Sequence, residues 1–171
     1  MKRLSSIIAG ATVLATLFTG CAKGGTPVLT VTTAPAVSAT TAQTTDPSKG
    51  VQVTFTDSNI TASSANGLDI DGTFMRITAS GTYTLSGKCK NGSVKVKKGV
   101  TGVTLILNGL DLTSEATAPI VCAKGSEVTI EIAAGTENAL TDTEANNDET
   151  GNENAENAVI KCKDGSQVTL G

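Results

Sequence analysis

The chain has 171 residues, a formal net charge of -3, 2% aromatic residues and no histidine. This length suits one ordinary domain. The lack of histidine excludes Ser-His-Asp and Cys-His catalysis and any histidine-ligated zinc site. The scarcity of aromatic rings also makes a sugar site of several stacked rings hard to assemble. We expect no nucleic-acid partner.

Residues 1–20 are predicted to be a lipoprotein signal peptide. Lys2 and Arg3 precede an apolar run from Ile7 to Phe18, which is too short to span a membrane stably. The small residues before Cys21 resemble the bacterial lipoprotein processing box, in which the cysteine becomes the N-terminus and carries lipid. We therefore expect an extracellular protein anchored through Cys21 to the outer face of the cell membrane. A plain secretory peptide with an incidental cysteine is the alternative.

Residues 21–50 are predicted to be a tether. They are rich in Thr, Ala, Ser and Pro and show almost no aliphatic periodicity. Such a segment buries too little apolar surface to fold, and it acts as an extended spacer. We expect the ordered domain, residues 51–171, to begin near Val51.

The domain is predicted to be all-β. Apolar and polar residues alternate in 51–55, 68–70 and 75–77, and glycine-containing turns separate these segments. No helical period is evident. The segments are rich in threonine and β-branched residues, as is typical of strands.

A sequence repeat sets the expected architecture. Residues 118–130 and 158–170 are identical at seven of 13 positions, and a looser copy begins at Val94. Fixed-period self-similarity is typical of stacked architectures, so we predict a right-handed parallel β-helix. An antiparallel β-sandwich would explain the alternation but not the repeat. Because the sequence stops within a repeat, we expect this domain to be the N-terminal part of a longer solenoid.

The repeat also predicts side-chain directions. Lys161 and Lys163 must face water, so the residues that alternate with them face inward. The predicted inward columns are Val94/Ile120/Ile160 and Val96/Cys122/Cys162. Val121 is expected to face water. The stacked Cys122 and Cys162 are expected to be buried free thiols, because parallel Cβ vectors fit disulfide geometry poorly; a disulfide is the alternative.

Three motifs then suggest a family. Gly81–Gly87 (GTYTLSG), Val103–Leu112 (VTLILNGLDL) and Gly135–Asp142 (GTENALTD) occur in this order. Together they resemble a bacterial family of secreted carbohydrate-binding β-helix proteins, and the resemblance covers residues 51–171. It implies a fold similar to that of pectate-degrading lyases, bound calcium, and cell-wall polysaccharide ligands, notably polygalacturonate and cellulose. The motifs identify no binding residue.

Four lysines form the candidate carbohydrate site. Lys95 and Lys161 share one predicted outward column, and Lys97 and Lys163 share the next. A cationic strip on an otherwise acidic protein suits an extended polyanion such as a uronic-acid chain. The alternative is that these lysines only keep an exposed face soluble.

An acidic insertion between the last two repeats is the candidate calcium site. Asp142, Glu144, Asp148 and Glu153 fall at positions 1, 3, 7 and 12 of a calcium-loop spacing. No helical flanks are evident, so an EF-hand is not implied. A solvated acidic loop is the alternative.

We therefore predict a non-catalytic cell-surface protein that binds an acidic plant cell-wall polysaccharide such as polygalacturonate, with calcium as its cofactor. A calcium-dependent polysaccharide lyase is the first alternative, disfavoured because no paired carboxylates accompany the lysines. A surface adhesin or structural spacer without a sugar ligand is the second.

Overall fold

The computed structural model describes residues 46–147, 151 and 153–171. These described residues belong to one compact unit. The predicted signal peptide, Cys21 and most of the predicted tether lie outside the described residues. Within the described part, no helix is both long and apolar enough to cross a membrane.

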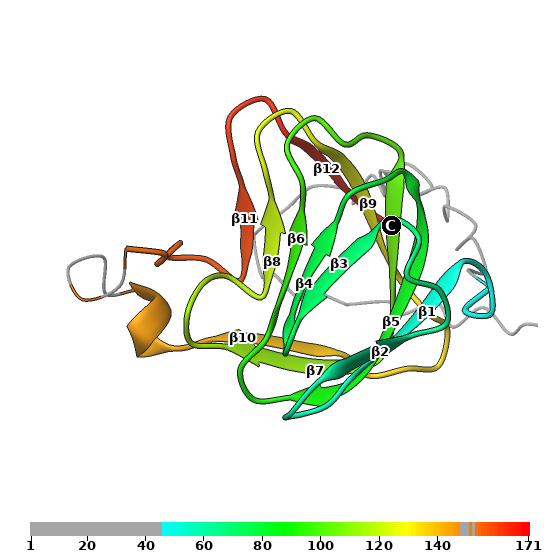
Figure 1. Cartoon of the computed structure of the whole chain (residues 1–171), viewed down its shortest axis with the longest axis horizontal. Coiled ribbons are helices and arrows are strands. Elements are labelled where there is room, and N and C mark those ends of the chain that lie inside the picture. The colour runs from blue at the N-terminus through cyan, green and yellow to red at the C-terminus, as the bar shows by residue number, and fades with distance from the viewer. Residues whose placement is uncertain (1–45, 148–150, 152) are drawn as a thin grey trace, which may run out of the picture. The chain divides into compact units, whose positions relative to one another are not determined.

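The described residues of the domain form two sheets and one short helix (Figure 1). The first sheet contains β1 (Val51–Phe55), β2 (Ile60–Ala62), β5 (Gly81–Cys89), β7 (Val103–Ser114), β9 (Glu127–Ile132), β10 (Ala139–Asp142) and β12 (Gln167–Leu170). The second contains β3 (Leu68–Asp71), β4 (Phe74–Ile77), β6 (Ser93–Val96), β8 (Ile120–Cys122) and β11 (Ile160–Cys162). A 3-10 helix, η1 (Glu144–Asn147), follows β10.

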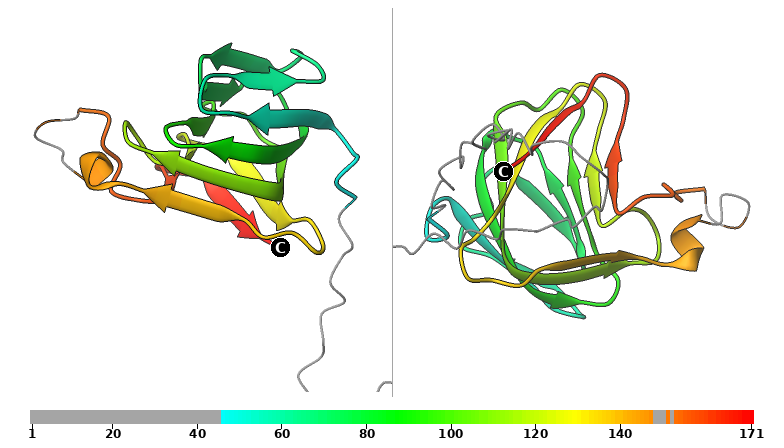
Figure 2. Two further views of the ribbon diagram at one scale, coloured as in Figure 1. Left: turned by 90° about the horizontal axis from the view of Figure 1, so that it is seen from below. Right: turned by 180° about the vertical axis from the view of Figure 1, so that it is seen from behind.

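Strand order reflects stacking of the repeats. The first sheet runs β12-β9-β7-β5-β1-β2, with β10 also beside β7, and the second runs β11-β8-β6-β4-β3. Successive passes of the chain lie one above another, as Figure 2 shows. The two sheets enclose one apolar core between them, so the second sheet has an inner face on the core and an outer face.

The expected right-handed parallel β-helix is wrong, because both sheets are mixed. β1 pairs with β2 antiparallel, and β3 pairs with β4 antiparallel. Only short turns join these strands, and a short turn permits antiparallel pairing but not a parallel crossover. The alternative, an antiparallel β-sandwich, is wrong as well, because successive strands of the second sheet, β4, β6, β8 and β11, pair with one another in parallel.

The predicted register of the repeats is confirmed. Ile120 lies between Val94 and Ile160 in the second sheet, and Val128 lies between Val103 and Val168 in the first. The side chains of Val94 and Ile120 are fully buried. Burying one such side chain contributes about 1.5–3 kcal/mol, so every stacked pass adds to the same core.

Two predicted side-chain environments are wrong. Val121 is 1% exposed rather than solvated; it lies in register between Lys95 and Lys161, and residues of the insertion, Glu153 to Glu156, lie beside it on the outer face. Cys162 is exposed rather than buried, because β11 is an edge strand and is covered on one side only. Cys122 and Cys162 are free thiols, as predicted, and so is Cys89, for which no prediction was made.

A glycine allows the first sheet to bend. The pairing of β5 with β7 shifts register between Leu85 and Gly87. Gly87 has a φ of 93°, and a Cβ there would lie 2.3 Å from the carbonyl oxygen of Phe55. Glycine is therefore required both by backbone conformation and by the close approach of β1.

Candidate functional site

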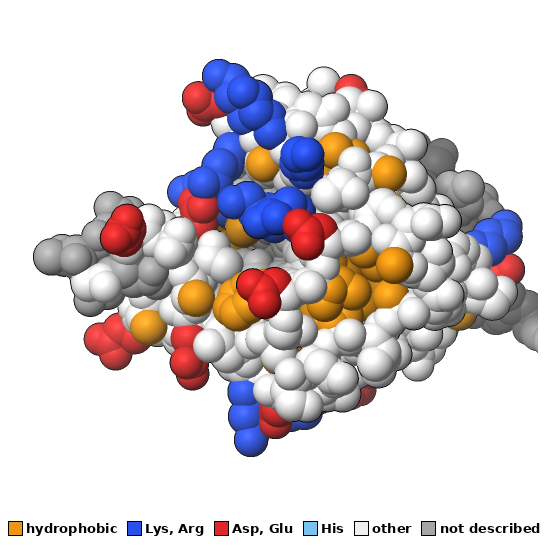
Figure 3. All heavy atoms as spheres, viewed as in Figure 1, with side chains coloured by type: hydrophobic (Ala, Val, Ile, Leu, Met, Phe, Trp, Pro, Cys, Tyr) orange, Lys and Arg blue, Asp and Glu red, His pale blue; other side chains and the backbone are white. Residues whose placement is uncertain are grey.

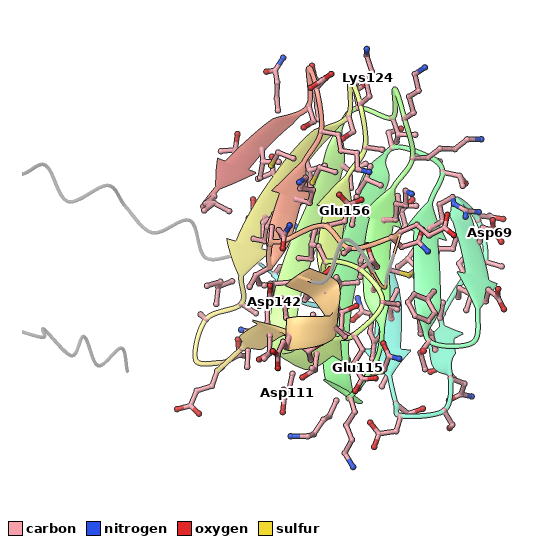
Figure 4. The ribbon with its side chains drawn as sticks, turned by 90° about the vertical axis from the view of Figure 1, so that its left-hand side faces the viewer. Asp69, Asp111, Glu115, Lys124, Asp142 and Glu156 are labelled. Carbon is pink, nitrogen blue, oxygen red and sulfur yellow. The ribbon has the colours of Figure 1, made fainter. Side chains whose placement is uncertain are left out.

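A groove crosses the outer face of the second sheet. Its volume is about 750 Å³, and strands β3, β4, β6 and β8 provide most of its floor. Figure 4 looks onto this side of the molecule, with Asp69 on the edge strand β3 and Glu156 over the middle of the sheet. In Figure 3, basic side chains gather over this part of the surface beside acidic and hydrophobic ones. The charged lining residues are Asp69, Asp71, Arg76, Lys95, Glu153, Glu156 and Lys163.

One row of residues in register runs across the strands. Pairing places Asp69 opposite Arg76, Arg76 opposite Lys95, and Val121 between Lys95 and Lys161. Arg76 Nη1 lies 2.6 Å from Asp69 Oδ2, and both side chains are more than half exposed. Such an exposed pair contributes at most about 1 kcal/mol. Arg76 is therefore partly neutralised, whereas Lys95 forms no ion pair with any described residue.

The four predicted lysines divide into two pairs with different surroundings. Lys95 lies on β6 and Lys97 follows the end of that strand, and both are exposed. Lys163 Nζ lies 2.6 Å from Glu156 Oε1, and Lys161 Nζ lies 3.8 Å from Glu156 Oε2. Lys161 Nζ also donates a hydrogen bond to the backbone oxygen of Glu156 at 3.0 Å. One carboxylate of the protein itself thus engages two of the four cations and offsets one of their two positive charges.

Asn146 fixes the segment that carries Glu156. Its side chain is fully buried, and its Oδ1 accepts a hydrogen bond from the backbone N–H of Glu156 at 3.0 Å. Its Nδ2 donates to the backbone oxygen of Ala158 at 3.3 Å. The acidic insertion therefore folds back onto the outer face. The sequence analysis missed the roles of Asn146 and Glu156, because an aperiodic insertion carries no signal of its path.

Apolar side chains line the groove at the β3–β4 hairpin. Ile70 and Phe74 are each 36% exposed. An exposed aromatic ring offers a flat apolar surface on which a sugar ring packs. The sequence analysis also missed Phe74, although a signal was present: Met75 and Ile77 face the core, so the alternation of a strand places Phe74 outside.

The candidate calcium ligands are spread over the insertion. Asp142 ends β10, Glu144 begins η1, and Glu153 lines the groove, while Asp148 lies outside the described residues. In the part of the chain that the structure describes, no group of three or more acidic, cysteine or histidine side chains is arranged to hold a metal ion. The described members of the predicted set therefore do not form a cage among themselves.

The marked shifts of pKa belong to residues other than those lining the groove. Burial, followed by the neighbouring Cys162, raises the pKa of Cys122 to about 12. Burial also raises the pKa of Tyr83, whose hydroxyl donates to the backbone oxygen of Ala79 at 3.0 Å. The hydrogen bond to Asp111 raises the pKa of Lys88. These shifts reflect packing and an ion pair rather than an acid–base pair in the groove.

These features define an all-β protein whose stacked strands carry a charged groove with an exposed aromatic ring. A family model described as carbohydrate-binding domain-containing protein matches residues 71–169. The chain belongs to this family, which confirms the carbohydrate-binding part of the resemblance.

The chain is also similar to individual proteins. A carbohydrate-binding domain-containing protein of Acetivibrio thermocellus is 32% identical over 114 residues, covering 66% of this chain and 40% of the relative. The solved structure of the polysaccharide lyase-like protein from C. thermocellum, a gadolinium derivative, matches with a TM-score of 0.60 and 31% identity. That match covers 70% of this chain and 48% of the other. The chain thus spans less than half the length of either protein.

Proposed function

We propose that this protein binds polysaccharide without cleaving it, and that an extended sugar chain lies in the groove across β3, β4, β6 and β8. The observation that carries the proposal is the groove itself, with Phe74 at one end and Lys95 on its floor. Phe74 would pack against a sugar ring, and the polar lining would hydrogen-bond hydroxyl groups. Membership of a carbohydrate-binding family supports this use of the groove.

We further propose that the preferred ligand is an acidic polysaccharide such as polygalacturonate. Lys95 on β6 and Lys97 just after it are exposed and form no ion pair with a described residue, so they are available to uronate carboxylates. Each exposed contact contributes about 0–1 kcal/mol. Affinity would therefore require several contacts together and would fall with salt, which screens charges over about 10 Å at 0.1 M.

A calcium-dependent polysaccharide lyase is the second candidate, because one similar structure is a polysaccharide lyase-like protein. The groove favours binding over cleavage. A lyase needs a basic side chain that can take a proton from the sugar. Arg76 and Lys163 form ion pairs with Asp69 and Glu156, so among the basic residues that line the groove only Lys95 has no ion pair with a described residue. Cleavage would release unsaturated uronates with ultraviolet absorbance, so incubation with polygalacturonate, with and without calcium, separates the two functions.

We also propose that Cys21 carries lipid and displays the domain at the cell surface, as the processing-box resemblance implies. Metabolic labelling with a fatty acid tests this. A Cys21→Ser variant should lose the label and leave the membrane fraction, and retention of both would contradict lipidation.

The binding test compares two variants of equal charge. Replacing both Lys95 and Lys97 by Gln should remove most retention on polygalacturonate and reduce its salt dependence. Replacing Lys98 and Lys124 by Gln is the matched control, because both lysines are exposed and neither lines the groove, whereas the first pair includes Lys95 on the groove floor. Equal losses in the two double variants would show a general charge effect and contradict this site.

A second comparison addresses the aromatic ring. Phe74→Ala should weaken binding to polygalacturonate and to cellulose alike, because packing against a sugar ring does not depend on its charge. The melting temperature should change little, since the side chain is 36% exposed. All binding measurements should be repeated with chelator, which separates lysine contacts from any calcium bridge.

A further inference from the structure

We propose that Glu156 is a specificity-determining residue: its carboxylate occupies the place where a ligand carboxylate would meet Lys161 and Lys163. The inference rests on the proposed polysaccharide-binding function. It assigns to the acidic insertion the role of an internal competitor, which limits how strongly the groove attracts a fully ionised polyuronate.

The contacts of Glu156 support this role. One carboxylate oxygen contacts Lys163 at 2.6 Å and the other faces Lys161 at 3.8 Å. The side chain of Glu156 is 13% exposed, whereas those of Lys161 and Lys163 are 38% and 40% exposed. A ligand can therefore reach the two cations, but it finds an anion already beside them.

The competitor is held in position. Asn146 is fully buried, and its Oδ1 accepts a hydrogen bond from the backbone N–H of Glu156 at 3.0 Å. A group tethered beside its partner acts at a high effective concentration. In addition, salt screens a partly buried ion pair less than it screens an exposed contact with a ligand. An external carboxylate is thus at a disadvantage at Lys161 and Lys163 compared with Lys95.

The charge of the groove indicates the ligand class. Three basic and four acidic side chains line it, which gives a formal net charge of -1. A chain with a carboxylate on every sugar would meet repulsion at Glu156, whereas one with carboxylates on only some sugars could place neutral residues there. We therefore assign the groove to acidic polysaccharide of low charge density, such as partly methyl-esterified polygalacturonate.

The test uses Glu156→Gln, with Glu153→Gln as its matched control. Both residues line the groove and both changes remove one negative charge, but Glu153 makes no ion pair with a described lysine. Glu156→Gln should raise affinity for fully ionised polygalacturonate by about threefold to tenfold, since it frees both Lys161 and Lys163 to contact ligand carboxylates. Affinity for the esterified polymer should change less than twofold, and Glu153→Gln should have a small effect on both.

Equal gains in the two variants would show a net-charge effect and overturn the inference, as would no gain in Glu156→Gln. If neither the wild type nor the variant binds either polymer, the inference falls together with the proposed function. If replacing Lys95 and Lys97 abolishes binding while Glu156→Gln has no effect, the function stands and this inference fails. A gain in Glu156→Gln without any effect of Lys95 and Lys97 would retain the inference and relocate the binding site.

Discussion

The buried side chain of Asn146 accepts a hydrogen bond from the backbone N–H of Glu156, ten residues further along the chain. This contact joins the two ends of the acidic insertion and sets the position of the Glu156 carboxylate over Lys161 and Lys163. One internal amide thus links the packing of the insertion to the charge of the groove.

Asn146→Ala should destabilise the domain by about 1–3 kcal/mol, because it removes a fully buried amide and leaves the partly buried backbone groups of Glu156 and Ala158 without their partner. The amide hydrogen of Glu156 should also exchange faster. Chemical denaturation and hydrogen exchange measure the two effects. Asn66→Ala, in an exposed turn, is the control and should stay within about 0.5 kcal/mol. An unchanged exchange rate at Glu156 would show that Asn146 does not hold the insertion.

Ile120→Asp should destabilise the domain by several kcal/mol, because it places a carboxylate in the apolar core without a partner. Val121→Asp should cost clearly less, although Val121 is also buried. Its neighbours in register are Lys95 and Lys161, which would pair with the new charge. Thermal unfolding measures both variants, and equal losses of melting temperature would contradict the assignment of the two sheet faces.

Gly87→Ala should destabilise more than Gly99→Ala. Both glycines have positive φ, 93° and 74°, so both substitutions incur a cost of about 1 kcal/mol from backbone conformation. Only at Gly87 does the new methyl group meet a backbone atom, the Phe55 oxygen at 2.3 Å. The denaturant midpoints of the two variants are compared, and the extra loss in Gly87→Ala measures the steric clash. Equal shifts in the two variants would contradict the close approach of β1 to β5.

The stability of the domain should fall as pH rises above about 9. The pKa of Cys122 is raised from 9.0 to about 12, so the folded state retains a proton that the unfolded chain loses in this window. The corresponding slope is at most about 1.4 kcal/mol per pH unit. Cys122→Val, which matches Val96 in register, should make the decline shallower between pH 9 and 10. Identical slopes would contradict the shift.

The burial of each cysteine predicts how fast its thiol is alkylated. Iodoacetamide at pH 8 should modify the exposed Cys162 in the native protein, whereas Cys89 and Cys122 are buried and should react only after unfolding. Mass mapping of peptides cut after glutamate distinguishes the sites, because Glu115, Glu127 and Glu156 separate the three cysteines, whereas trypsin would release Cys89 and Cys162 as the same Cys-Lys dipeptide. Early modification of Cys122 would show that the core opens locally.

The sequence by itself determined the all-β class and the register of the stacked strands. Side chains at equivalent positions of a repeat must meet the same neighbours, so the spacing of Ile120 and Ile160 was sufficient to pair them. Membership of a carbohydrate-binding family was likewise indicated by motifs in the strands. Phe74 could have been found from the same alternation.

Only the tertiary structure decided the rest. A period of two is common to parallel and antiparallel strands, so the hairpins of β1–β2 and β3–β4 were not distinguishable from stacked passes. The burial of Val121 depends on what lies over the outer face of the sheet, where residues of the insertion are its neighbours. The pairing of Glu156 with Lys163 depends on how an aperiodic insertion folds back. Such contacts arise from the path of the chain in space, and local periodicity carries no record of that path.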